Sequence, residues 1–205
     1  MKLSIAIAFL ILIPFTPKNS VKSLKKPSDQ SELKKAYFAS GCFWCVEAIY
    51  ERTKGVLNVV SGYSGGHTKN PTYESSNTGR TGHAEAVEIT YNASEISYAT
   101  LIDIYYATQN PHQFNGQGPD KGSQYRSIIF YTTPEEKTIA LSKKRNLEQT
   151  TQKKVASEIK LFEKFWKAEA YHQDYEKNHP NHPYILNVSK PRIYKFTSKF
   201  PELVK

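Results

Sequence analysis

Apolar residues recur along the chain with two spacings, and each spacing predicts one kind of element. Where apolar and polar residues alternate, as in part from Ala84 to Tyr91, the two-residue period predicts a β-strand. From this pattern, and from short apolar runs next to turn residues, we expect strands over residues 36–40, 56–63, 84–91, 126–131 and 158–162.

Helical spacing predicts the elements between these strands. Apolar residues three and four apart form a stripe after Ser97, and the run that begins at Thr133 has the arrangement of a capping box with proline at the first helical position. We expect helices over residues 43–53, 97–108, 133–154 and 164–177, followed by a proline-punctuated tail. Strands interleaved with helices predict an α/β or α+β domain. Of the two we expect α+β, a two-layer sandwich of a mixed β-sheet flanked by helices.

One long segment, residues 109–124, has neither spacing and is rich in Gly, Asn and Pro. Long irregular loops inside compact domains are usually functional. We therefore expect this loop to form a wall of the functional site.

The first residues have a different composition. Lys2 precedes an apolar run from Leu3 to Phe15, which ends in prolines and polar residues. The run is short for a membrane span and has the layout of a secretory signal peptide. No clean cleavage site of small residues follows, so an uncleaved anchor stays open. We expect a signal or anchor over residues 1–20, a flexible leader over 21–34, a folded domain over 35–205, and an exported protein, periplasmic or secreted.

The net charge of +9 says little about the function, because it is spread over single lysines and short pairs. Basic stretches such as Lys143-Lys144-Arg145 fall within a predicted helix, where a solvated face is the simpler interpretation than nucleic-acid binding. We expect no nucleic-acid partner. The sequence has no heptad repeat or long apolar edge, so we expect a monomer.

The cysteines are more informative, because the chain has only two and they form the C-x-x-C of Cys42 and Cys45. A structural disulfide closing so small a loop would add only roughly 2 kcal/mol. A redox role is therefore favoured. Val46 replaces the histidine that haem attachment needs, and two cysteines cannot make a four-cysteine zinc site. We expect no metal and no cofactor.

The predicted helix places Cys42 at its N-terminus, where the helix dipole and free N–H groups favour a thiolate. Cys45 lies three residues on, on the same helical face, within reach of a disulfide. A C-x-x-C alone is shared with thioredoxin-like enzymes, so it does not identify the reaction.

Several separate sequence blocks narrow the choice of reaction. They are Gly41-Cys42-Phe43-Trp44, Gly62-Tyr63-Ser64-Gly65-Gly66, Asn70-Pro71-Thr72-Tyr73, Gly82-His83-Ala84-Glu85 and the run from Gly118 to Ser127. In content and in order they resemble the A-type peptide methionine sulfoxide reductases, from about Lys35 to Ile193. The resemblance implies reduction of the S epimer of methionine sulfoxide, free or in proteins, as a repair of oxidative damage.

The resemblance also implies roles for individual residues. Cys42 attacks the sulfoxide sulfur and becomes a sulfenic acid, while Glu85 donates a proton to the departing oxygen. To donate at neutral pH, that carboxyl must be held protonated, as a partly apolar pocket can do. The remaining positions match substrate-binding residues of the family: the phenols Tyr73 and Tyr125, the polar Asp120, and the aromatic walls Phe43 and Trp44.

The chain departs from a common pattern of the family at Cys45. Many members have glycine there and carry resolving cysteines near the C-terminus, whereas no cysteine follows Cys45 here. The spacing suggests that Cys45 resolves the sulfenic acid as a disulfide, which a thioredoxin-like donor then reduces. The alternatives are a thiol–disulfide oxidoreductase and a secreted binding module with a stapled turn. Neither needs an acid and phenols around an oxygen.

Overall fold

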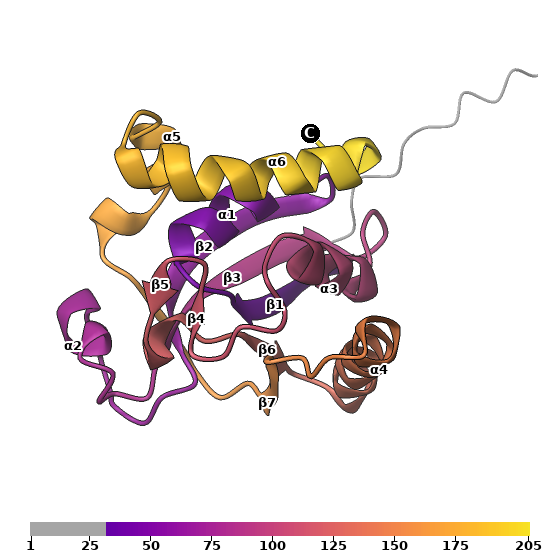
Figure 1. The fold of residues 1–205 in the computed structure, drawn as a ribbon, viewed down its shortest axis with the longest axis horizontal. Coiled ribbons are helices and arrows are strands. Elements are labelled where there is room, and N and C mark those ends of the chain that lie inside the picture. Colours follow the sequence, from indigo (N-terminus) through magenta and orange to yellow (C-terminus); the bar gives the residue numbers. More distant parts are fainter. Residues whose placement is uncertain (1–31) are drawn as a thin grey trace, which may run out of the picture.

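The computed structural model describes residues 32–205 (Figure 1). The expected signal or anchor over residues 1–20, and the expected leader as far as residue 31, lie outside the described residues. Strand β1 begins at Leu33, two residues before the expected start of the folded domain, because Leu33 and Lys34 pair with Asn92 and Tyr91. No helix within residues 32–205 has the length and apolar character needed to cross a membrane.

One mixed sheet of six strands, in the order β7-β6-β1-β3-β2-β8, organises the fold. Its strands are β1 (Leu33–Ala39), β2 (Val56–Ser64), β3 (Ala84–Asn92), β6 (Ile128–Tyr131), β7 (Glu158–Leu161) and β8 (Phe165–Lys167). Neighbouring strands run antiparallel except β6 and β7, which are parallel. The spacing of apolar residues predicts all of these strands except β8.

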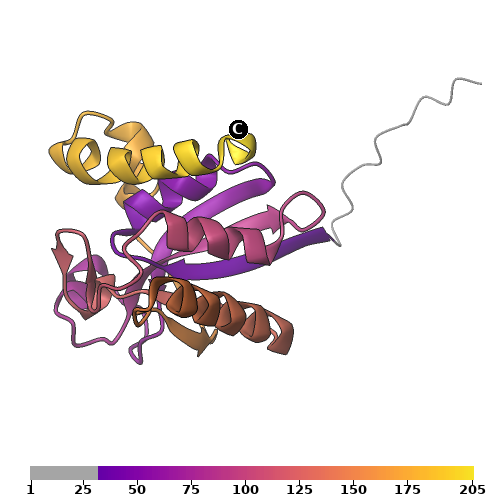
Figure 2. The same ribbon diagram turned by 45° about the vertical axis from the view of Figure 1, so that its right-hand side comes forward.

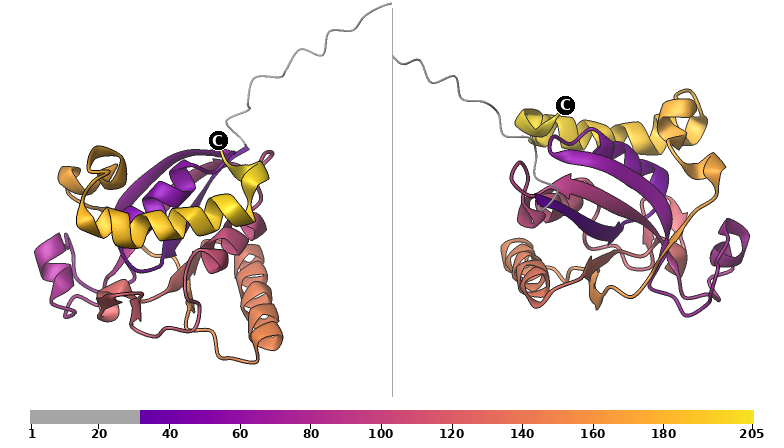
Figure 3. Two further views of the ribbon diagram at one scale, coloured as in Figure 1. Left: turned by 45° about the horizontal axis from the view of Figure 1, so that its top comes forward. Right: turned by 180° about the vertical axis from the view of Figure 1, so that it is seen from behind.

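Helices pack against this sheet and against each other. They are α1 (Phe43–Glu51), α2 (Tyr73–Asn77), α3 (Tyr98–Ala107), α4 (Pro134–Thr151), α5 (Tyr175–Asn178) and α6 (Lys190–Lys199). Helix α1 lies on β2 and β3, α6 lies along α1, and α3 contacts α4 (Figures 2 and 3). The expected α+β fold, a mixed sheet with flanking helices, is confirmed.

Alternation along the strands divides the core between the two faces of the sheet. Within β3, Val87 and Ile89 join the main core beneath the helices, whereas Ala84 and Ala86 belong to a smaller cluster on the opposite face. Glu85 has the same parity as Val87, so its side chain lies on the helical face of the sheet. This register aims a carboxyl at the start of α1.

The predicted helix over residues 164–177 is wrong. The segment contains β8, a 3₁₀ turn at Ala170–His172 and the short α5. Strand β8 adds to the sheet beside β2, and Asp174 adopts a left-handed backbone with φ of 53°, which no continuous α-helix tolerates. Pairing at the sheet edge therefore overrides the helical spacing of this sequence.

The tail is also more regular than its prolines suggest. A π-helical segment, Ile185–Ser189, leads directly into α6, and Pro191 lies in the first turn of α6. The backbone stays helical through Ser189 and Lys190, so Pro191, which has no N–H to donate, directly follows a π-turn in which the regular hydrogen-bond pattern is already changed. The expected loop over residues 109–124 holds a small hairpin of β4 (Gly116–Gln117) and β5 (Asp120–Lys121).

Candidate active site

Cys42 is the N-cap of α1, at the point where the chain leaves β1. Gly41 makes this turn with φ of +69°, and a Cβ at Gly41 would lie only 2.5 Å from the Cβ of Gln117. Glycine is required here both for the backbone conformation and for the close approach. The carbonyl of Cys42 accepts a bond from the Cys45 N–H at 3.2 Å, which starts the first helical turn. Both cysteines are buried free thiols, and Cys42 is 6% exposed.

The surroundings of Cys42 and Cys45 shift the pKa values of the two thiols in opposite directions. Burial raises the pKa of Cys42, and Cys45 and the Glu85 carboxyl raise it further. The hydrogen bond from Cys42 lowers the pKa of Cys45 to about 6, with help from the Arg192 charge and the Ser189 hydroxyl. These directions favour the charge of the resting pair on Cys45, and the expected thiolate on Cys42 stays a prediction.

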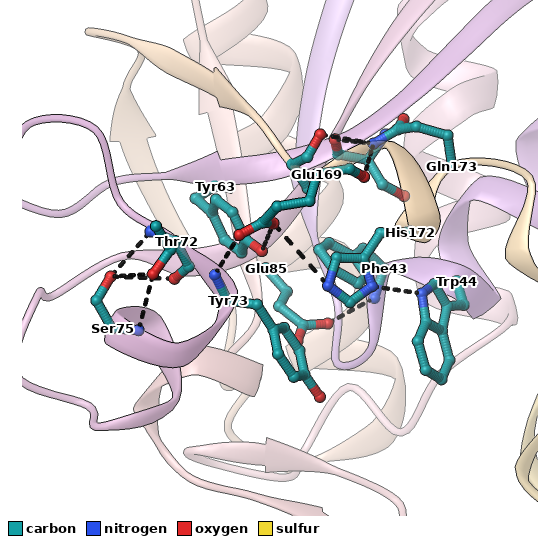
Figure 4. A network of polar contacts seen from close by, with 12 residues as sticks. Phe43, Trp44, Tyr63, Thr72, Tyr73, Ser75, Glu85, Glu169, His172 and Gln173 are labelled. Atoms are coloured by element: carbon teal, nitrogen blue, oxygen red, sulfur yellow. Dashed lines mark hydrogen bonds and ion pairs between the residues drawn. The ribbon is translucent and has the colours of Figure 1, made fainter.

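Glu85 is almost fully buried, with 2% exposure, next to the first turn of α1. Its Oε2 accepts the Phe43 N–H at 3.0 Å (Figure 4). Burial raises the pKa of Glu85 to about 8; the Phe43 N–H opposes this rise, and the charges of Asp120 and Cys45 add to it. At neutral pH this carboxyl is mostly protonated, as a proton donor must be.

Asp120 comes from the loop that was expected to line the site, and Tyr125 is the residue that directly follows this loop. Burial raises the pKa of Asp120, and its Oδ2 accepts the Tyr184 hydroxyl at 2.6 Å. The Tyr125 hydroxyl has a long contact of 3.5 Å to Asn77. Burial raises the pKa of Tyr125, and the nearby Glu85 carboxyl raises it further. Tyr125 therefore remains a phenol that can donate a hydrogen bond.

Tyr73 is the first residue of α2, which Thr72 caps. The Tyr73 N–H donates to Glu169 Oε1 at 2.9 Å, and the Tyr63 hydroxyl donates to Glu169 Oε2 at 2.9 Å (Figure 4). The Tyr73 ring lies 4.5 Å from the ring of His172. One carboxylate, Glu169, thus fixes the short helix that presents this phenol.

The two aromatic residues after Cys42 have different positions. Phe43 is 1% exposed and belongs to the core, in contact with Tyr63 and His172. Trp44 is half-buried, stacks on Tyr175 with ring centroids 3.6 Å apart, and donates its indole N–H to His172 Nδ1 at 3.1 Å. Trp44 therefore offers the accessible apolar wall, and Phe43 supports it from behind.

Four residues around the site were not predicted as site residues: Glu169, His172, Tyr175 and Tyr184. All come from the segment that was expected to be a helix and an irregular tail. A compositional signal was available, since residues 171–184 hold three tyrosines and three of the chain's six histidines. Within residues 32–205, no group of three or more His, Cys, Asp or Glu side chains is arranged to hold a metal ion.

A buried thiol pair beside a protonated carboxyl, phenols and an aromatic wall defines a thiol-dependent reductase that can protonate an oxygen of its substrate. The family model described as peptide methionine sulfoxide reductase matches residues 34–203. The peptide methionine sulfoxide reductase MsrA of Saccharolobus solfataricus is 48% identical over 170 residues, which cover 83% of this chain and 96% of the relative. The chain belongs to the peptide methionine sulfoxide reductase family, and it is a peptide-methionine (S)-S-oxide reductase.

Solved structures agree with this assignment. The crystal structure of reduced Mxr1 from Saccharomyces cerevisiae has a TM-score of 0.71 and 29% identity, covering 76% of this chain and 91% of that one. Mxr1 in complex with Trx2 shares the fold, with a TM-score of 0.51 and 20% identity, over 74% of this chain and 90% of the other.

Proposed function

We propose that the enzyme reduces the S epimer of methionine sulfoxide, free or in proteins, by oxygen transfer to Cys42, and that Cys45 resolves the product. The observation that carries this proposal is the position of the two cysteines. Cys42 and Cys45 share one helical turn, and the chain has no other cysteine. Any disulfide formed within a single chain must join these two residues.

The first step transfers oxygen. Cys42 passes its proton to the Cys45 thiolate and attacks the substrate sulfur, while Glu85 protonates the sulfoxide oxygen. The attack forms a bond between the two sulfurs. The oxygen then transfers to the Cys42 sulfur as the substrate S–O bond and this S–S bond break, so methionine leaves as the thioether and Cys42 carries a sulfenic acid. The sulfoxide is reduced and the cysteine is oxidised by the same two electrons.

The phenols and aromatic residues bind the substrate. Tyr73 and Tyr125 are placed to donate hydrogen bonds to the sulfoxide oxygen, beside Asp120. Trp44 offers its ring to the S-methyl group, a contact favoured by sulfur–aromatic attraction. A carboxyl, two phenols and a hydrophobic wall suit a polar S=O next to a methyl group.

The second step restores the thiols. Cys45 gives up the proton that it accepted in the first step, and its thiolate attacks the Cys42 sulfur. The S–S bond forms, the S–O bond breaks, and the departing hydroxide takes that proton to become water. A dithiol donor of the thioredoxin class then reduces the disulfide. The yeast complex of Mxr1 with Trx2 supports this class of donor.

The reaction is tested with the separated epimers of methionine sulfoxide and dithiothreitol as reductant. We expect turnover of the S epimer and none of the R epimer. If neither epimer is reduced while insulin disulfides are, the protein is a thiol–disulfide oxidoreductase instead.

The role of Cys45 is tested with Cys45→Ser. This variant should release one equivalent of methionine per enzyme but should cycle poorly with thioredoxin, and Cys42→Ser should give no methionine at all. Normal thioredoxin-driven cycling by Cys45→Ser would rule out Cys45 as the resolving thiol.

We also propose that the protein acts outside the cytoplasm, on the basis of the apolar run from Leu3 to Phe15. We further propose that it is a monomer, because the sequence has no heptad repeat or long apolar edge. Cell fractionation and N-terminal sequencing of the recovered protein test the export signal and its cleavage. Recovery of uncut protein from the cytoplasm alone would contradict export, and light scattering of the purified protein tests the monomer.

A further inference from the structure

The segment before α6 reaches the second cysteine of the pair. Ser189 and Cys45 are both fully buried, and their Oγ and Sγ atoms lie 2.9 Å apart. Ser189 ends the π-helical segment Ile185–Ser189, in which the Lys190 N–H donates to the Ile185 carbonyl. A π-turn adds one residue to a helical turn and often marks a functional site. Here the wider turn comes just before the point where Ser189 contacts Cys45.

Arg192, three residues further along the helix, is 8% exposed. Its guanidinium donates to the Thr108 carbonyl at 2.9 Å, to the Ser40 carbonyl at 3.0 Å and to Ser40 Oγ at 3.1 Å. All three acceptors are uncharged, and within residues 32–205 no Asp or Glu forms a salt bridge with Arg192. A buried cation without an anion is costly, so the missing counter-charge needs an explanation.

Cys45 and Asp120 are two nearby groups whose negative charge Arg192 stabilises, and Cys45 is the one that belongs to the thiol pair. Arg192 holds the backbone just before Cys42, because its Nη1 donates to the Ser40 carbonyl. The same Nη1 lies close to Gly41, at 3.6 Å from where a Cβ on Gly41 would be. From this position its charge favours ionisation of Cys45. The positive charge therefore lies beneath the turn that carries both sulfurs.

We propose that Arg192 and Ser189 are positioning residues that hold the Cys45 sulfur as a thiolate, ready to attack the sulfenic acid on Cys42. This inference rests on the proposed resolving role of Cys45. The reaction they promote is the second step: the thiolate forms the S–S bond, the S–O bond breaks, and the released hydroxide is protonated to water. Without Arg192 and Ser189, Cys45 would be a buried neutral thiol, which is a poor nucleophile.

Other groups around Cys45 also affect its ionisation. The Cys42 thiol and the Tyr184 hydroxyl, which donates to Asp120, both lower the pKa of Cys45. The acidic groups in contact with this cluster are Glu85 and Asp120, whose own pKa values burial raises. For Asp120 the Tyr184 hydroxyl and the Arg192 charge oppose this rise, so the Arg192 charge favours an anion at Asp120 as well as at Cys45.

The first experiment titrates Cys45 directly. In a Cys42→Ser background the serine hydroxyl can still donate to Cys45, and thiolate absorbance in the ultraviolet reports the remaining thiol. We expect Cys45 to titrate near its pKa of about 6. Arg192→Met should raise that pKa by about one unit or more, Arg192→Lys should restore part of the shift, and Ser189→Ala should raise it less.

Two exposed residues of α4 provide matched controls. Arg145→Met and Ser142→Ala make the same chemical changes far from the thiols and should leave the titration unchanged. If Arg192→Met does not fold, as judged by circular dichroism, Ser189→Ala carries the test. An unchanged titration in every folded variant would overturn the proposal.

The second experiment separates the two chemical steps in enzyme that retains both cysteines. After one equivalent of sulfoxide, methionine release reports oxygen transfer, and loss of a dimedone-reactive sulfenic acid reports resolution. In Arg192→Met we expect the loss of the sulfenic acid to slow about tenfold at about pH 6.5. Its rate should recover as the pH rises, because the Cys45 thiolate then forms without the Arg192 charge. Equal slowing of both steps at every pH would mean a merely structural role and would overturn the proposal.

The two proposals fail in different ways. If Cys45→Ser cycles normally, the resolving role is wrong, whatever the titration shows. If Cys45→Ser is blocked but Arg192→Met and Ser189→Ala titrate and resolve like the parent, Cys45 resolves without help from Arg192 and Ser189.

Discussion

Replacing Glu85 with glutamine is expected to inactivate the enzyme and to stabilise its fold. Burial raises the pKa of this carboxyl from its ordinary value of 4.5 to about 8. The folded state therefore binds the proton more tightly than the unfolded state. The stability that depends on this proton is complete below about pH 4.5 and is lost as the pH rises to about 8.

The size of the effect follows from the two pKa values. Their difference corresponds to about 5 kcal/mol at or above pH 8, and about 3 kcal/mol of this is already lost at pH 7. A glutamine still offers an oxygen to the Phe43 N–H and is neutral at every pH, so the variant avoids this loss. Its turnover should fall by about a hundredfold to ten-thousandfold, since an amide cannot supply the carboxyl proton.

Urea denaturation at several pH values measures the first effect. Between about pH 5 and pH 8, the free energy of unfolding of Glu85→Gln relative to that of the parent should rise by about 3 to 4 kcal/mol. Glu135→Gln, at an exposed position of α4, is the matched control and should show no such change. A constant separation between the parent and Glu85→Gln across this range would refute the reasoning, because Glu85 would then not be held protonated.

Three further substitutions test other parts of the structure. Gly41→Ala introduces a Cβ 2.5 Å from Gln117 at a positive φ, so it should lower the free energy of unfolding by about 1–3 kcal/mol and reduce turnover, as measured by denaturation and kinetics. Tyr175→Leu removes the ring stacked at 3.6 Å on Trp44 and should raise KM about threefold to tenfold with little change in kcat, as steady-state kinetics will show. Glu47→Gln replaces a buried carboxyl outside the site whose pKa burial raises to about 8, so it should stabilise the protein at pH 8, as denaturation at that pH will show, without loss of activity.

Matched variants separate the causes of these effects. Gly118 also has a positive φ, of +59°, but a Cβ there would meet nothing within 4 Å, so Gly118→Ala isolates strain from steric clash. Tyr194 is 72% exposed, and Tyr194→Leu should leave KM unchanged. Equal effects of Gly41→Ala and Gly118→Ala would contradict the importance of the Gln117 contact. An unchanged KM in Tyr175→Leu would contradict the support of Trp44, and a loss of activity in Glu47→Gln would place that residue in the site.

Five of the six strands of the main sheet could be predicted from the sequence, because a two-residue period, as in part of β3, or a short apolar run next to turn residues marks them. The residues of β8 have a helical spacing instead. The same parity that puts Val87 in the main core places Glu85 under α1, so the carboxyl and the start of the helix could be related before the structure was known. Cys42 was predictable as the residue that begins α1, because Gly41 marks the turn before it.

Long-range contacts could not be predicted in this way. Glu169 contacts Tyr73 across 96 positions of the chain, and His172 accepts from Trp44 across 128. No local spacing encodes either contact. The low pKa of Cys45 was missed for the same reason: helix position is a local property, whereas the Arg192 charge and the Ser189 hydroxyl come from the far end of the fold.

The division of charge between the two thiols has a consequence for an enzyme that works among oxidants. The sulfur favoured as a thiolate, Cys45, has no exposed surface, and the partly accessible Cys42 keeps its proton at rest. Peroxides and alkylating agents react with thiolates, so a protonated Cys42 and a fully buried Cys45 should both react slowly with them. A sulfoxide bound beside Cys42 differs, because the transfer of the Cys42 proton to Cys45 produces the reactive thiolate next to the substrate sulfur. We therefore expect this division of charge to slow overoxidation of the pair while it remains reactive toward its substrate.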